Sequence, residues 1–441
     1  MFFNSLEYSV FLLIVLVGFI LTNKAKLLAY RNLLLLAASY YFYSQLNPLF
    51  VGLLLFTTVV NYFAGAAIQK QQRTGGSGKC QVTIAIILSL ALLIFFKYAY
   101  VVDSSILLPV GLSFFTFQAL TYSIDIYRKK IQAEDNIINV ALFIAFFPTL
   151  LSGPIERARN LIPQLKDKTV INLESLESGV QLFIYGLFKK VVIADRLKEY
   201  VDWAYVAPDE KSGSTLALAA VFYSFQIYCD FSGYADMAIA SGRILGFKLM
   251  DNFKLPYCAS TIKEFWRRWH ISLTSWFTEY VYISLGGNRV SQLRWVFNIS
   301  AVFLLSGIWH GATFSFVLWG ALHAVYYLIE KYYGPKNPNW VYHLFIFVLI
   351  TIAWIFFRIE DVTVAASVVQ KIACDLFSPI GQGVSTFSSL ITSCLLLLFI
   401  GREYLLYKQI LLQKYRLEYV FLLLCICLLG ATSSGFVYFQ F

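Results

Sequence analysis

Charged residues are scarce in this sequence. Only 14% of its 441 residues are Asp, Glu, Lys or Arg, whereas 59% are hydrophobic, and the mean hydropathy is +0.67. A soluble globular protein carries about 25% charged residues. The shortage of charge excludes a soluble domain and predicts a polytopic membrane protein.

The sequence also lacks the common motifs of metal and soluble-enzyme sites. Its seven cysteines include no C-x-x-C pair, so neither a disulfide framework nor a zinc site is indicated. Neither G-x-S-x-G nor H-E-x-x-H occurs, which removes support for an activated serine or a zinc hydrolase. The stretch "GGSGK" (75–79) lacks the spacing of a phosphate-binding loop. We expect no metal and no bound cofactor.

Apolar runs long enough to cross a bilayer, which takes about 20 helical residues, recur along the whole chain. No repeat, proline-rich linker or low-complexity tract interrupts them, so we expect one membrane-embedded domain over 1–441. The predicted fold is all-α, with about eleven transmembrane helices and further re-entrant or interfacial helices. Candidate crossings lie near 8–23, 31–47, 49–68, 81–101, 106–126, 137–152, 177–194, 215–246, 293–330 (two segments), 341–358, 386–401 and 417–438.

Basic residues follow alternate early segments, in three clusters. The loops between these clusters, "SQLNP" and "VVDSS", carry none. The positive-inside rule therefore predicts an N-terminus outside the cell and a first segment retained as a span. The net charge of +10 then reflects cytoplasmic loops against anionic membrane lipid, and we expect no nucleic acid partner. The clusters are Lys24, Lys26 and Arg31; Lys70, Arg73 and Lys79; and Arg128, Lys129 and Lys130.

The stretch 227–289 mixes charges and aromatic residues within apolar sequence, which is typical of amphipathic helices at a membrane interface. Asp230 and Asp236 lie there among small residues. A carboxylate in a membrane is costly unless it has a partner or faces a cavity. We expect each to pair with a basic residue such as Arg243, Arg267 or Arg268, with a direct role in a polar cavity as the alternative.

Two histidines lie in an apolar run that has no Asp, Glu, Lys or Arg between Arg294 and Glu330. As one helix this run would be about 52 Å long, too long for a bilayer core of about 30 Å. The glycines beside His310 predict a turn there, and irregular backbone at that depth lines a cavity or is buried in protein.

His323 lies 13 residues beyond His310, about 220° around and about 20 Å along a straight helix. The two histidines should therefore not serve the same atom. We assign the chemistry to His310. For His323 we expect a secondary or structural role, in which its ring donates to a carbonyl one turn away.

From these residues alone an enzyme and a transporter or flippase stay equally open, because both use intramembrane charges and broken helices. A transporter would show two similar halves, and none is visible here. A scaffold without catalysis would not need a histidine in a glycine-flanked turn.

Five ordered motifs resemble the membrane-bound O-acyltransferase (MBOAT) family, in its bacterial polysaccharide O-acetyltransferase branch. They lie most specifically within 146–330 and read "FFPTLLSGPIERARNLIPQL", "DFSGYADMAIASGRILGFKLMDNFKLPY", "STIKEFWRRWHISLTSWF", "YVYISLGGNR" and "SGIWHGATFSFVLWGALH". The resemblance implies helices around a central tunnel. It places the family's catalytic histidine on His310, beside Trp309, a second polar active-site residue on His270, and a further histidine of this branch on His323.

The resemblance also implies the reaction. An acyl group, in the first place acetyl, would pass from acetyl-CoA or an acylated carrier protein on the cytoplasmic side to a polysaccharide hydroxyl or a periplasmic partner protein, in the bacterial inner membrane. His310 would act as general base, His270 would orient the acceptor or stabilise developing charge, and Arg267 would hold donor phosphate. Where the branch commonly reads Arg-Asp-Tyr, this chain has Thr278, Glu279 and Tyr280, and Ser284 replaces a proline; these departures lie on the acceptor side. D-alanyl transfer to teichoic acid is the related alternative.

Overall fold

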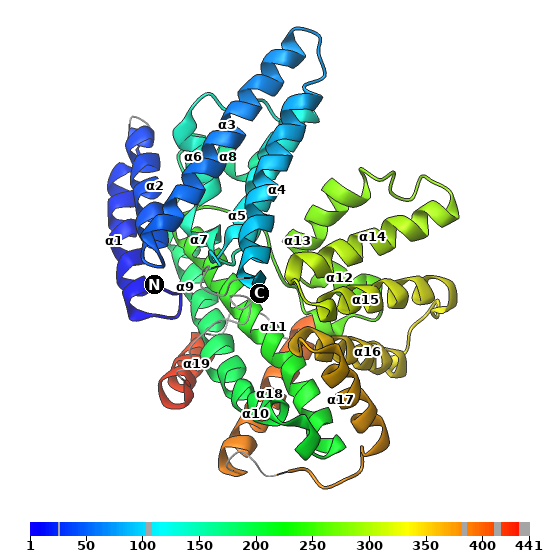
Figure 1. The fold of residues 1–441 in the computed structure, drawn as a ribbon. Helices are drawn as coiled ribbons and strands as arrows, with labels where there is room; N and C mark the ends of the chain where they lie inside the picture. Colours follow the sequence, from blue (N-terminus) through cyan, green and yellow to red (C-terminus); the bar gives the residue numbers. More distant parts are fainter. Residues whose placement is uncertain (25–26, 103–107, 382–385, 410–415, 432–441) are drawn as a thin grey trace. The chain divides into compact units, whose positions relative to one another are not determined.

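The computed structural model describes residues 1–24, 27–102, 108–381, 386–409 and 416–431. These residues form helices and connecting loops, with no strand among them (Figure 1). The prediction of an all-helical chain is confirmed.

Within the described residues, three helices are long and apolar enough to cross a membrane: Pro48–Arg73, Lys79–Ala99 and Trp340–Arg358. Shorter apolar helices span Leu6–Thr22, Val362–Cys374 and Leu417–Leu429. The total of about eleven crossings stays a prediction.

Contacts between Cα atoms divide the chain into two compact units, each built from two stretches of sequence. Unit 1 comprises Met1–Gly186 and Tyr234–Asp251, and unit 2 comprises Leu187–Gly233 and Asn252–Phe441. The helix α11 (Gly213–Ile244) contributes its first part to unit 2 and its last part to unit 1. Whether the whole chain acts as one membrane domain stays a prediction.

Unit 1 is a helical bundle in which α3 packs on α4, α5 and α6, and α2 packs on α1 and α6. Its helices are α1 (Leu6–Thr22), α2 (Leu28–Ser44), η2 (Pro48–Phe50), α3 (Val51–Arg73), α4 (Lys79–Val102), α5 (Leu112–Tyr127), α6 (Ile137–Ala145), α7 (Phe147–Leu150), α8 (Ala158–Lys166) and α9 (Leu173–Phe188).

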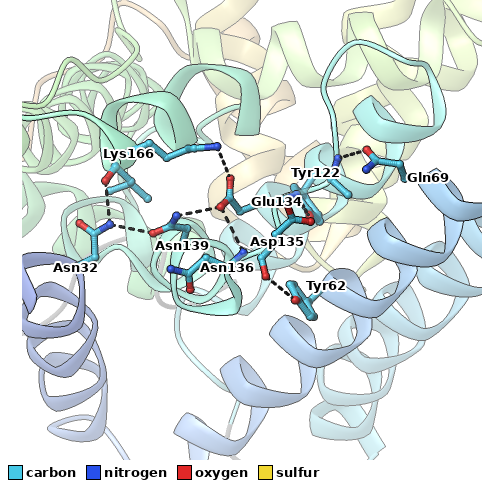
Figure 2. A network of polar contacts seen from close by, with 11 residues as sticks. Asn32, Tyr62, Gln69, Tyr122, Glu134, Asp135, Asn136, Asn139 and Lys166 are labelled. Carbon is cyan, nitrogen blue, oxygen red and sulfur yellow. Dashed lines mark hydrogen bonds and ion pairs between the residues drawn. The ribbon is translucent and has the colours of Figure 1, made fainter. Parts of the chain in front are cut away.

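A polar network joins α2, α6 and α8 within unit 1 (Figure 2). Asn32 donates to Asn139 Oδ1 at 2.9 Å, Asn139 donates to Glu134 Oε1 at 3.1 Å, and Glu134 pairs with Lys166 at 3.1 Å. Next to it Arg31 is fully buried and donates to backbone carbonyls. Arg31, which the sequence places in the first basic cluster, is thus a structural residue of α2.

Unit 2 contains a helical hairpin, in which α14 and α15 pack side by side and α15 packs on α16 (Figure 1). The chain reverses at residues 311–313, so the predicted turn beside His310 is confirmed. The elements of unit 2 are η3 (Lys189–Ala194), α10 (Asp195–Val206), η4 (Pro208–Glu210), the first part of α11, η5 (Pro256–Cys258), α12 (Ile262–Arg268), α13 (Ile271–Trp276), η6 (Phe277–Tyr282), α14 (Gln292–His310), α15 (Phe314–Tyr333), α16 (Trp340–Arg358), α17 (Val362–Cys374), α18 (Thr386–Tyr407) and α19 (Arg416–Leu429).

Two glycines allow the backbones of the hairpin to approach closely. A Cβ atom at Gly307 of α14 would overlap the carbonyl oxygen of Phe316 on α15, and one at Gly320 of α15 would overlap that of Phe303 on α14. Small residues at such positions are typical of helix pairs in membranes. The glycines therefore hold His310 close to α15.

Candidate active site

His310 is the last residue of α14 and is buried among aromatic rings. Its ring centroid lies 4.7 Å from that of Trp309, 5.1 Å from that of Trp319 and 5.1 Å from that of Phe357, in T-shaped contacts. The walls around this imidazole thus come from α14, α15 and α16. A neutral imidazole can act as a base.

His270 lies at the junction of α12 and α13, where it is buried and has a left-handed backbone conformation with φ of 43°. Its ring meets Trp309 in a T-shaped contact with 6.1 Å between centroids. Trp309 therefore contacts both His270 and His310. The structure brings these three predicted residues together within unit 2.

A hydrogen-bond network holds the His270 ring. Its Nδ1 lies 3.0 Å from Oδ1 of Asn252, and the Ser272 hydroxyl donates to the same oxygen at 2.9 Å. The helix that His270 caps has six residues and is too short to span a membrane. Burial lowers the pKa of His270 to about 3, so its ring is neutral at physiological pH.

His323 is fully buried on α15, with its ring 4.9 Å from those of Trp266 and Trp319. Neither ring nitrogen has a hydrogen-bond partner among the described residues. The expectation that it donates to a carbonyl one turn away is wrong. The straight-helix geometry is wrong as well: His310 and His323 both pack on Trp319, because the chain reverses between them.

Asp230 is buried on α11 and forms an ion pair with Lys190 of η3 at 2.6 Å. Lys190 also pairs with Asp195 at 2.8 Å. The expectation that Asp230 pairs with a basic residue is confirmed. The partner is a lysine from η3 and not one of the expected arginines. The π-helical turn of η3 brings Lys190 and Asp195 to one side of the chain.

The other charged candidates have different environments. Arg267 is exposed near the end of α12, whereas its neighbour Arg268 pairs with Glu264 at 2.7 Å. Asp236 is half-buried on the last part of α11 and belongs to unit 1. The binding role of Arg267 and the pairing of Asp236 stay predictions.

Sequence reasoning missed three residues that shape this region: Asn252, Trp319 and Lys190. Asn252 stands within the quoted stretch "LMDNFKLPY", but nothing in its spacing points to His270, 18 residues later. Lys190 had a usable signal, since a pair of lysines within an apolar run is expensive without acidic partners. Among the described residues, no group of three His, Cys, Asp or Glu side chains could hold a metal ion.

Comparison with known proteins identifies the family to which the chain belongs. The family model for membrane-bound O-acyltransferases matches residues 77–363, a range that includes His270, His310 and His323. The chain belongs to the membrane-bound O-acyltransferase family.

Three relatives carry the names of enzymes that acylate different polymers. The chain is 40% identical over 357 residues to a probable alginate O-acetylase of Azotobacter vinelandii, covering 76% of this chain and 71% of the relative. It is 34% identical to a peptidoglycan O-acetyltransferase of Helicobacter pylori, covering 80% and 75%. A teichoic acid D-alanyltransferase of Bacillus subtilis is 26% identical, covering 76% and 90%.

The predictions of a polytopic membrane protein and of an enzyme are therefore confirmed. The protein is a membrane-bound O-acyltransferase, and the transporter alternative is set aside.

Proposed function

We propose that this enzyme transfers an acetyl group from a thioester on the cytoplasmic side of the bacterial inner membrane to a hydroxyl group on the outer side. The acceptor is a cell-envelope polysaccharide, or a partner protein that passes the group on. The names of the relatives support the acetyl group and the polysaccharide acceptor, because they describe acetylation of alginate and peptidoglycan. The N-terminus faces outward in this scheme.

His310 acts as the general base. Its imidazole takes the proton of the acceptor hydroxyl as that oxygen attacks the thioester carbonyl carbon. The tetrahedral intermediate then collapses and the carbon–sulfur bond breaks. The imidazolium returns its proton to the departing sulfur, which leaves as the thiol. The observation that carries this proposal is the contact of the Trp309 ring with both His310 and His270, two buried imidazoles of unit 2.

The remaining candidates support this centre. Trp309 and Trp319 keep the base in apolar surroundings, His323 belongs to the packing behind it, and Arg267, exposed at the end of α12, attracts the phosphates of the donor. Asp230 holds Lys190 within the fold, and Asp236 forms an ion pair in unit 1.

The relative that transfers D-alanine to teichoic acid supports a second donor and acceptor. A direct test incubates the purified protein in nanodiscs with radiolabelled acetyl-CoA, an acetylated carrier protein or a D-alanylated carrier protein. We expect loss of label from one of the two acetyl thioesters. Consumption of the D-alanyl thioester alone would overturn the acetyl assignment and favour the second function.

A further inference from the structure

We infer that Asn252 is a positioning residue, which fixes the tautomer of His270 so that its Nε2 atom accepts a hydrogen bond from the acceptor hydroxyl. The inference rests on the proposed function only in naming that hydroxyl. It decides between two roles that the sequence leaves open for His270: orienting the acceptor or donating a hydrogen bond to the developing oxyanion.

The orientation of the Asn252 amide follows from its donors. The backbone N–H of Ser272 and the Ser272 hydroxyl both point to the same atom of Asn252, at 3.4 and 2.9 Å. A backbone N–H can only donate, so this atom is the amide oxygen Oδ1. Oδ1 has no hydrogen of its own, and the 3.0 Å contact with His270 Nδ1 is a hydrogen bond only if Nδ1 carries the proton.

The neutral ring carries a single proton, so a proton on Nδ1 leaves a lone pair on Nε2. An Nε2 lone pair repels an oxyanion and accepts from a hydroxyl. His270 therefore orients the acceptor and cannot supply the oxyanion donor, which must come from elsewhere.

Asn252 is well placed for this task because it is 1% exposed and is tied to the same turn twice. Its backbone carbonyl accepts from the N–H of Ile271 at 2.8 Å, in addition to the side-chain bonds. His270 itself has a positive φ, which histidine adopts more often than most residues but which the surroundings must hold in place. The turn thus fixes both the backbone and the ring of His270.

The chain contains only four histidines, so the tautomer can be measured directly. The full-length protein, labelled with ¹⁵N-histidine and reconstituted in liposomes, is studied by solid-state NMR, and the His270 signal is assigned by its loss in His270→Gln. We expect a protonated Nδ1 and an unprotonated Nε2. An Nε2–H tautomer in the wild-type protein would overturn the inference.

Asn252→Leu removes the acceptor, and we expect the Nδ1–H tautomer to lose its dominance and kcat to fall about 100-fold. Asn252→Asp keeps an oxygen in place and serves if the leucine variant does not fold. Its carboxylate favours the charged imidazolium, so the acidic limb of the pH–rate profile should move to higher pH. A lowered rate with an unmoved profile would mean that Asn252 is merely structural.

Thr274→Val is the matched control, because Thr274 lies on the same short helix and its hydroxyl donates to the carbonyl of Trp269, at 3.1 Å. It should change neither the His270 tautomer nor the profile. The role of His310 and the role of Asn252 can be refuted independently. Acyl transfer by His310→Ala would refute His310 as the base and would not affect the tautomer measured for His270. An unchanged tautomer in Asn252→Leu would refute the role of Asn252 alone.

Discussion

At the scale of single residues, His323 shows that a buried imidazole need not be a bonded one. Its two ring nitrogens are buried among aromatic rings without hydrogen-bond partners in the described part of the chain. An unsatisfied buried polar group costs about 1–3 kcal/mol. The unsatisfied nitrogens of His323 therefore lower the stability of the folded protein.

We predict that His323→Phe raises the apparent melting temperature of the detergent-solubilised protein, because phenylalanine removes the two unsatisfied nitrogens and keeps the ring. Each kcal/mol corresponds to about 2–4 °C in a protein of moderate size. His343→Phe, at a half-buried histidine of α16, is the control and should change the melting temperature little. A clear loss of stability in His323→Phe would show that the imidazole has a partner we have not identified.

The residue scale also shows what the sequence could and could not predict. Motif order pointed to His310 and His270, and the cost of a buried carboxylate correctly demanded a basic partner for Asp230. The identity of that partner, Lys190, depends on a π-helical turn 40 residues earlier, and Asn252 reaches His270 through a turn. Pairings between distant segments are set by packing, which spacing along one helix does not reveal.

At the scale of elements, the α14–α15 hairpin depends on close backbone contact at Gly307 and Gly320. Length and glycine content predicted its turn, because a single helix would have overrun the membrane. Length and glycine content could not predict that His310 and His323 would both contact Trp319. The angle between two residues on a straight helix does not apply when the chain reverses between them.

We predict that Gly307→Ala forces α14 and α15 apart and lowers both stability and acyl transfer, because its Cβ would overlap backbone atoms that cannot move aside. Overpacking of this kind costs about 1–3 kcal/mol. Gly401→Ala on α18 is the matched control, since nothing lies within 4 Å of the added Cβ. Melting curves and transfer rates of the two variants should differ clearly. Equal behaviour would contradict the close packing of the hairpin.

At the scale of the whole molecule, the proposed function requires the chain to connect a thioester on one side of a membrane with a hydroxyl on the other. The family and the apolar helices establish a membrane enzyme. Its orientation stays a prediction, made from the alternation of basic loops. The side of the membrane on which each early loop lies can be tested without an activity measurement.

We predict that, in a cysteine-free background, Gln45→Cys reacts with a membrane-impermeant maleimide in intact cells, whereas Ser77→Cys reacts only after the membrane is opened. Both positions are exposed, between α2 and α3 and between α3 and α4 respectively. The second lies in a basic loop, which the positive-inside rule predicts to face the cytoplasm. The opposite labelling pattern would reverse the proposed direction of transfer.

The central claim is that His310 is the base of the acyl transfer. Its most direct test measures the transfer of labelled acetyl groups to envelope polymer in membranes that contain wild-type protein, His310→Ala or the control His343→Ala, at equal amounts of inserted protein. Loss of a general base lowers the rate about 10²- to 10⁴-fold. We therefore expect the transfer rate of His310→Ala to fall by this factor and that of His343→Ala to match the wild type. Unchanged transfer by a normally inserted His310→Ala protein would contradict the account.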